Sequence, residues 1–300
     1  MKFDITTVAD KIRSDQVDLF SRFDVNDVTA LMDSIEEHRP YHFIPLSVTK
    51  VWDDVEKKFG RDGIEAFHRL TLLTLIAQFD ERSKSKGYSP SILSRFVHSF
   101  QRILDAIQDP AFEHYKTVGD IFLKDLALCR QRMFPAGAQI VVPQSSFHRA
   151  LFYRGGIGQM SKFAALMSKT GGNKNWFQIH THLLELEDFN PNGWDECYLR
   201  IADMLAIYPS VRGMWGGSWF YDPALEKVSP RLSYLRKVPA ENGAYVFYSN
   251  IDIDGGALAT SESRKKAYES GNYLPKSYSL MWPRRAMLDW AKEKRSQGQT

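Results

Sequence analysis

Hydrophobic residues recur at helical spacing through residues 1–135 of the chain. After Ser89-Pro90 they form one stripe, at Ile92, Leu93, Phe96, Val97, Phe100, Ile103, Leu104 and Ile107. Serine followed by proline is a frequent helix start, because the serine side chain can cap the first turn and proline fits its geometry. Similar stripes predict helices at 48–59, 64–79 and 118–133. We therefore expect residues 1–135 to form an all-helical domain or lid.

The pattern changes after Phe134-Pro-Ala-Gly-Ala, where short β-rich runs begin to alternate with helical ones. We predict strands at 139–142, 148–153, 175–187, 212–221, 244–250 and 276–282. We predict helices at 157–168, 193–208, 230–238, 263–270 and 285–294. Such alternation favours a mostly parallel or mixed sheet covered by helices. The predicted fold class is thus an all-helical region followed by a mixed-sheet α/β domain over residues 136–300, which carries the candidate site.

Composition and charge are those of a globular protein. Hydrophobic residues make up 43% and charged residues 25%, and the net charge of +3 is too small to indicate a nucleic-acid partner. Cys129 and Cys197 lie in apolar helical contexts, which favours buried thiols in a reducing compartment. We find no secretory signal and no apolar run long enough to span a membrane. We therefore expect a cytoplasmic protein; nothing in the sequence indicates its oligomeric state.

The first candidate for chemistry is a polar strand face. Strand side chains alternate, so Gln178, His180 and His182 should point the same way. Two histidines two residues apart can bind one metal ion or act in general acid–base chemistry, and they can also be structural. The metal-binding alternative needs a third ligand, and spacing selects none among His148, Asp222, Asp252 and Asp254. We therefore favour no metal.

The second candidate is the strand at 212–221, which carries Gly216 and Gly217 in mid-run. Glycine weakens a strand, so its presence suggests that a ligand chain or a bulge lies close to the backbone. Trp215, Trp219 and Tyr221 share one face and could line an apolar pocket. The alternative is that these aromatic residues pack in the core.

Two further segments could hold an anion. Arg154-Gly-Gly-Ile-Gly precedes a predicted helix, where backbone N–H groups and Lys162 could bind a phosphate, or the glycines could serve a tight turn. Arg284 and Arg285 follow Trp282-Pro and could bind phosphate or carboxylate, although surface arginines are common. They belong to a basic stretch, 264–300, which has nine Lys or Arg against three acidic residues.

The order strand, helix, glycine-bearing strand, helix, strand across 176–250 resembles the core of GNAT-type acyltransferases. The resemblance implies that acyl-CoA lies between two splayed strands, 176–184 and 212–221, beside Gly216 and Gly217. It implies that the pyrophosphate rests on the turn 189–193, with Asn192 and Gly193. It places His180, His182 or Ser218 where an acid or base is needed.

These patterns lead to one preferred hypothesis and two alternatives. We expect an intracellular enzyme, an acyl-CoA-dependent acyltransferase that acts on a small molecule or amine. One alternative is a metal-dependent enzyme built on the His180-x-His182 pair. The other is a non-enzymatic binding or scaffold protein, which would not require the polar strand face.

Overall fold

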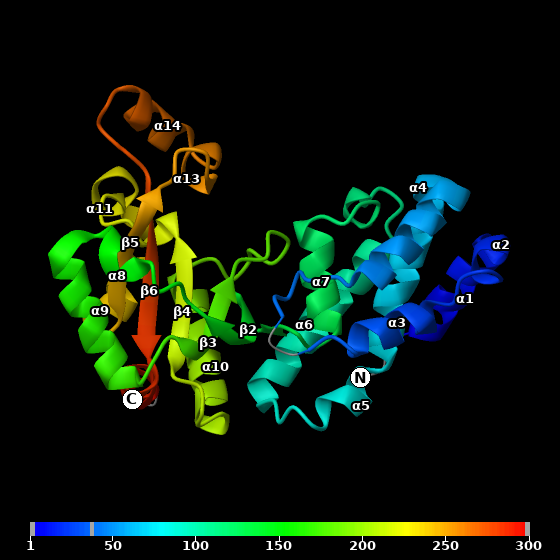
Figure 1. Ribbon diagram of the computed structural model, residues 1–300, viewed down its shortest axis with the longest axis horizontal. Helices are drawn as coiled ribbons and strands as arrows, with labels where there is room; N and C mark the ends of the chain where they lie inside the picture. The colour runs from blue at the N-terminus through cyan, green and yellow to red at the C-terminus, as the bar shows by residue number, and fades with distance from the viewer. Residues whose placement is uncertain (1–3, 37–38, 298–300) are drawn as a thin grey trace. The chain divides into compact units, whose positions relative to one another are not determined.

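The computed structural model describes residues 4–36 and 39–297 and divides the chain into two compact units (Figure 1). The first unit comprises Met1–Ala136 together with Thr181–Leu186. The second comprises Gly137–His180 and Glu187–Thr300. A short segment that follows a strand of the second unit therefore folds as part of the first.

The first unit is helical. Its elements are α1 (Ile5–Asp15), α2 (Val17–Phe20), α3 (Val25–Asp33), α4 (Leu46–Ala77), α5 (Phe79–Ser83), α6 (Pro90–Gln108), the 3₁₀ turn η1 (Glu113–Tyr115), α7 (Asp120–Cys129) and the two-residue strand β1 (Phe134–Pro135). Helix α4 is central and contacts α1, α3, α6 and α7. The two helices predicted at 48–59 and 64–79 are its two halves, which meet at a kink where Gly60 has φ 69°.

Helix α6 begins where the sequence predicts. The Ser89 hydroxyl accepts a hydrogen bond from the Ile92 N–H at 3.4 Å, and Pro90 occupies the first turn. The predicted stripe supplies buried residues such as Phe96, Phe100 and Ile103. Amphipathic periodicity and capping chemistry agree here, which is why this boundary could be read from the sequence.

The second unit contains five strands in the order β2-β3-β4-β6-β5. They are β2 (Ile140–Ser146), β3 (Lys174–His180), β4 (Gly213–Ser218), β5 (Tyr245–Ile251) and β6 (Lys276–Pro283). The pair β3–β4 is parallel, and β2–β3, β4–β6 and β5–β6 are antiparallel. The predicted fold class, a helical region followed by a mixed-sheet α/β region, is confirmed.

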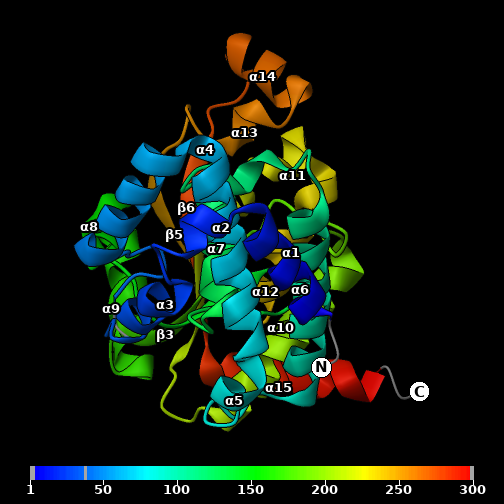
Figure 2. The same ribbon diagram turned by 90° about the vertical axis from the view of Figure 1, so that its right-hand side faces the viewer.

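Helices cover both faces of this sheet. They are α8 (Leu151–Arg154), α9 (Gly156–Thr170), α10 (Pro191–Ile207), α11 (Leu225–Val228), α12 (Tyr234–Glu241), α13 (Gly256–Ala259), α14 (Glu262–Glu269) and α15 (Arg284–Gln297), with 3₁₀ turns η2 (Trp219–Tyr221) and η3 (Pro230–Leu232). On one face α8 and α9 pack against Trp176, Trp215 and Met281. On the other, Trp282 packs against Tyr198 of α10 and Trp290 of α15, two helices that lie side by side (Figure 2).

Three predicted strands differ from the structure. The run 148–153 ends in the short helix α8, because a brief apolar run does not distinguish a strand from a buried helix. The predicted strand 175–187 ends at His180, where the chain leaves the second unit. The predicted strand 212–221 ends at Ser218, whose hydroxyl accepts from the Phe220 N–H and starts the turn η2.

Helix α10 lies close to its predicted position. It starts at Pro191, and the Asn190 side chain caps it by accepting the N–H of Gly193 at 3.0 Å. Cys129 and Cys197 are both buried, and no disulfide joins them. Within residues 4–36 and 39–297, no helix has the length and apolar character needed to cross a membrane.

Candidate functional site

The parallel pair β3–β4 is the distinctive feature of the sheet. Two residue pairs define its register, Phe177 with Met214 and Gln178 with Trp215. Both strands continue past this point but pair with their outer neighbours: Ile179 with Val141 of β2, and Gly216 with Leu280 of β6. The two central strands therefore stop pairing with each other, while each remains paired with its outer neighbour, β2 or β6.

The two glycines of β4 lie beyond the last β3–β4 pair, and their surroundings differ. A Cβ atom added to Gly216 would lie 2.6 Å from Cγ1 of Ile179 and 3.1 Å from the Tyr221 hydroxyl. Gly216 is thus required by close packing. At Gly217, which is exposed, the nearest atoms are Ser279 Oγ at 3.9 Å and a ring carbon of Trp215 at 4.0 Å. Packing does not require a glycine at position 217.

Polar groups accompany this end of the parallel pair. The Ser145 hydroxyl donates to Oε1 of Gln178 at 2.6 Å. The indole N–H of Trp215 is buried and has no hydrogen-bond partner in the described part of the chain. His180 is half-buried at the end of β3, and Ser218 is half-buried at the end of β4. The structure thus places His180 and Ser218 at the corresponding ends of two strands that no longer pair with each other.

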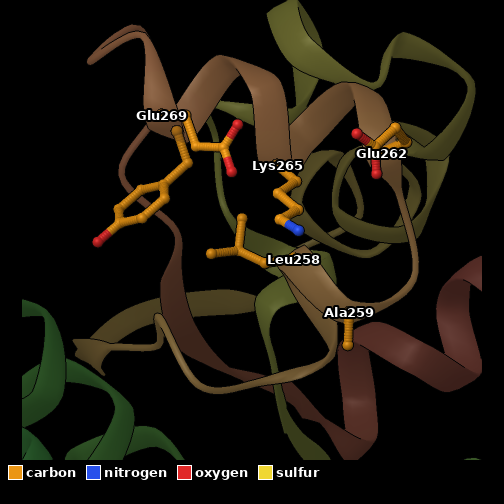
Figure 3. A pocket seen from close by; sticks show the side chains of 6 residues that line it. Leu258, Ala259, Glu262, Lys265 and Glu269 are labelled. Carbon is orange, nitrogen blue, oxygen red and sulfur yellow. The ribbon is translucent and has the colours of Figure 1, made fainter.

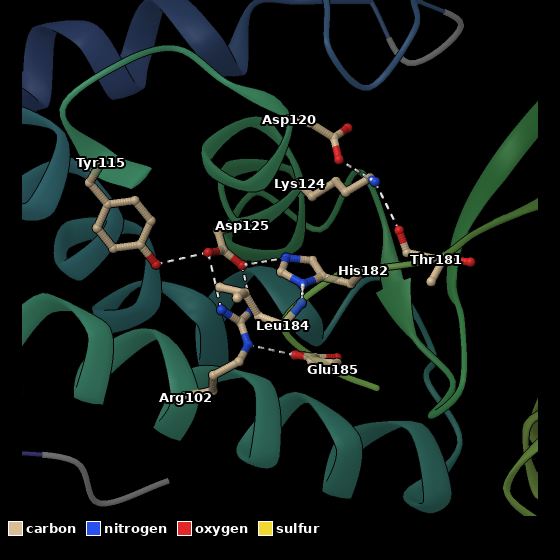
Figure 4. A network of polar contacts seen from close by, with 9 residues as sticks. All are labelled: Arg102, Tyr115, Asp120, Lys124, Asp125, Thr181, His182, Leu184 and Glu185. Atoms are coloured by element: carbon tan, nitrogen blue, oxygen red, sulfur yellow. Dashed lines mark hydrogen bonds and ion pairs between the residues drawn. The ribbon is translucent and has the colours of Figure 1, made fainter. Parts of the chain in front are cut away.

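His182 lies elsewhere, in a buried network of the first unit (Figure 4). The Leu184 N–H donates to Nδ1 of His182 at 3.2 Å, so Nε2 carries the proton and donates it to Asp125 at 3.1 Å. The imidazole is 1% exposed. Both ring nitrogens of His182 therefore bond within the protein, as in a structural histidine, and His182 does not share the strand β3 with His180.

Asp125 is the centre of this network. Its carboxylate accepts hydrogen bonds from the Tyr115 hydroxyl at 2.8 Å and from the Arg102 guanidinium, as well as from His182. The Arg102 Nε also donates to Glu185 at 3.0 Å. Burial alone would raise the pKa of Asp125, but the charge of Arg102 and the hydrogen bonds from His182 and Arg102 outweigh it and lower the pKa from 3.8 to about 2. Sequence reasoning did not find this cluster, because its members lie between residues 102 and 185 in no recognisable motif.

The start of α10 was expected to hold a pyrophosphate. Asn192 is exposed in the first turn of the helix. The N–H of Gly193 is engaged by the Asn190 side chain, and a Cβ atom at Gly193 would overlap the backbone carbonyl of Asp188. Close packing against Asp188 therefore accounts for the glycine at this position.

The glycine turn before α9 lines a cavity of about 470 Å³, together with Lys162, Arg236, Tyr248 and Tyr278. The side-chain amide of Gln159 donates to the Tyr248 carbonyl at 3.0 Å and accepts its N–H at 2.8 Å. It thus makes the two bonds that a neighbouring strand would make, and it attaches α9 to the edge strand β5.

A shallower cavity of about 390 Å³ lies on α13 and α14. Figure 3 shows Lys265 between Glu262 and Glu269, above the apolar side chain of Leu258. All three charged residues are exposed. Two carboxylates and one ammonium group line this exposed groove, so it does not present a concentrated charge of one sign.

Comparisons with known proteins found one similar solved structure and no matching family model or curated protein. Among solved structures, the chain is similar to a crystal structure of an acyltransferase in complex with decanoyl-CoA and teicoplanin, with 12% identity and a TM-score of 0.46 over 76% of this chain and 69% of that chain. Similarity at this level does not assign a function. Within the described residues, no group of three or more His, Cys, Asp or Glu side chains is placed to hold a metal ion.

Proposed function

We propose that the second unit binds an acyl-CoA between the ends of β3 and β4 and transfers the acyl group to a small molecule or amine. The observation that carries the proposal is the end of β3–β4 pairing after Gln178 and Trp215, while each strand stays paired with its outer neighbour. A ligand can take the place of the missing cross-strand partner, as peptides do when they add to a sheet edge.

The chemistry of the acyl donor suits this position. The pantetheine arm of CoA is extended and carries amide groups, which can exchange hydrogen bonds with strand edges. Gly217 is exposed, and an added Cβ atom there would make only ordinary van der Waals contacts, so its backbone can be approached by a ligand. The unpartnered indole N–H of Trp215 offers one further donor to an acceptor group of a bound molecule. These features support the GNAT-like reading of the sheet, with β3 and β4 as the splayed strands.

The proposal assigns one residue to proton transfer and one to the leaving group. The nucleophile of the acceptor attacks the thioester carbonyl, the C–S bond breaks, and the CoA thiolate leaves. We assign His180 as the group that accepts the proton of the nucleophile, since an imidazole can do so at neutral pH. The Ser218 hydroxyl, at the end of the other strand, is assigned as a hydrogen-bond donor to the leaving thiolate. His182 has no part in this proposal, because its ring nitrogens bond to Asp125 and Leu184.

Donor binding is tested by thermal unfolding with CoA and with acyl-CoA of short to long chain length. A ligand at about 100 times its Kd stabilises by roughly 2.7 kcal/mol, which raises Tm by several degrees. We expect Gly217→Val to abolish this rise while its own Tm in buffer stays near that of the wild type. Gly158→Val is the control, because it adds the same side chain at another exposed glycine, where nothing lies within 4 Å of an added Cβ atom. Absence of any shift in the wild type with every donor would refute the proposal.

Acyl transfer to a panel of amines is measured by the release of the CoA thiol. We expect His180→Gln to lower kcat by roughly 10²-fold or more while the donor-induced rise in Tm remains. Unchanged turnover in this variant would remove His180 from the mechanism. Donor binding without turnover on any acceptor would favour the non-enzymatic alternative.

A further inference from the structure

A third cavity of the second unit has a strongly basic lining. It measures about 740 Å³ and lies where the end of α9, the turn before β4 and the start of α15 meet. Lys169, Arg212, Arg284 and Arg285 line it, against one carboxylate, that of Asp289. We call it the basic cavity. Nothing in the proposed acyl transfer uses it, because it lies at the beginning of β4, and β3 and β4 cease to pair towards the other end of that strand.

Two of the arginines are held in fixed positions. Arg212 donates through Nη1 to the Thr170 carbonyl at the end of α9. Arg284 donates through Nη1 to the carbonyls of Leu205 and Tyr208 at the end of α10. Helix C-termini attract cations, so these bonds fix both guanidinium groups. None of their other nitrogens is among the buried polar atoms that lack a partner. Their remaining nitrogen atoms are therefore accessible to solvent, and both residues line the cavity.

The other two cations are exposed. Arg285 is 96% exposed and 3.9 Å from Asp289, which is itself 68% exposed. Such an exposed ion pair contributes little free energy, so Asp289 competes only weakly with another anion for Arg285. Lys169 is exposed and lies with its Nζ 5.6 Å from the centre of the Tyr245 ring. Val211 and Tyr245 give the cavity an apolar wall beside the charges.

The positive charges around the cavity repel one another when no anion is bound. Arg284 and Arg285 form the first turn of α15, a helix of 14 residues with no acidic residue in that turn. The N-terminus of a helix carries partial positive charge, so it disfavours cations and attracts anions. Four cations and a helix N-terminus around one space repel one another, and a bound anion relieves this repulsion.

We infer that the basic cavity binds a small phosphate-bearing molecule with at least two negative charges. Guanidinium groups hold phosphate oxygens through paired N–H donors, which Arg212 and Arg284 present in fixed orientation. The volume exceeds that of phosphate alone and lies in the usual range for small-molecule sites. The remaining part of the molecule contacts Tyr245 and Val211. The inference does not depend on acyl transfer.

Calorimetric titration with inorganic pyrophosphate tests the inference. The variant Lys169→Gln with Arg285→Gln removes two cations that make no structural bond to a backbone carbonyl. The matched control is Lys265→Gln with Lys266→Gln, which removes the same charge from exposed positions of α14. We expect the first variant to weaken binding by about tenfold or more and the control to change it by less than about twofold.

Four results would overturn the inference. The first is no binding of pyrophosphate by the wild type at about 10 mM. The second is an equal loss in both double variants, which would indicate non-specific attraction to net charge. The third is competition between CoA and pyrophosphate, because the basic cavity would then belong to the donor site. Pyrophosphate binding with no effect of either double variant would likewise place the anion elsewhere.

Discussion

Replacing Asp125 by asparagine tests whether the buried network stabilises the first unit through charge. Asp125 is fully buried, and its pKa is lowered from 3.8 to about 2, since Arg102 and His182 outweigh the cost of burial. By linkage, this difference corresponds to roughly 2.5 kcal/mol of stability at neutral pH. Removal of one partner from a buried ion pair costs about 3–5 kcal/mol when the other charge is left alone. Arg102 keeps Glu185 at 3.0 Å, so we expect a loss at the lower end of this range, about 3 kcal/mol.

The sign of the pH dependence follows from the lowered pKa. The stability due to the Asp125 charge is fully present above the unfolded value of 3.8 and is lost as the pH falls towards 2. The difference between wild type and Asp125→Asn should therefore be constant near neutral pH and shrink below about pH 4. Urea unfolding across this range measures the difference. Hydrogen exchange of the α6 and α7 amides reports on the first unit by itself.

A control on the same helix separates burial from charge. Asp120 pairs with Lys124 at 2.6 Å, but its side chain is 55% exposed. We expect Asp120→Asn to cost less than about 1 kcal/mol. Equal effects of the two substitutions, or a loss at Asp125 that does not change between neutral pH and pH 3, would contradict the reasoning.

Two further predictions concern other buried positions. Burial lowers the pKa of His68 from 6.5 to about 4, so the unfolded chain binds a proton that the folded chain excludes, and stability should fall as the pH drops through that window. His68→Asn should flatten this slope, and an unchanged slope in urea titrations would disprove the assignment. Gly216→Ala should cost roughly 1–3 kcal/mol through overlap with Ile179. In a double-mutant cycle with Ile179→Ala, the two losses should not add; additive losses would show that the two positions do not interact.

Periodicity predicts the elements of this chain better than their ends. The stripe after Ser89 predicts α6 together with its start, because the apolar face and the cap belong to one local segment. The end of β3 depends on a tertiary event, the inclusion of Thr181–Leu186 in the other unit. The sequence of residues 175–187 alone does not predict it. The Asp125 network was missed for the same reason, since Arg102 and Glu185 lie 83 residues apart.

The order of strands and helices was readable from the sequence, but the pairing of the strands was not. Alternating elements indicate a sheet covered by helices, yet they do not determine that β3 and β4 pair over two positions and then pair outward. The register of a strand depends on both neighbours, and β6, one of the neighbours of β4, follows about 60 residues later. The resemblance to the GNAT core implies two splayed strands here, but the residues at which β3 and β4 stop pairing are known only from the structure.

Two pairs of like residues in the sequence, the glycines Gly216 and Gly217 and the histidines His180 and His182, have different surroundings in the structure. Gly216 and Gly217 look equivalent in the sequence, but Ile179 fills the space beside the first, whereas a Cβ atom at the second would meet only ordinary contacts at 3.9 and 4.0 Å. His180 and His182 share a strand face only if one strand continues through both, and β3 ends at His180. Packing thus accounts for Gly216 and internal hydrogen bonds account for His182, so neither needs a ligand to explain it. Gly217 and His180 lie next to the end of β3–β4 pairing, and the proposed acyl transfer depends on them.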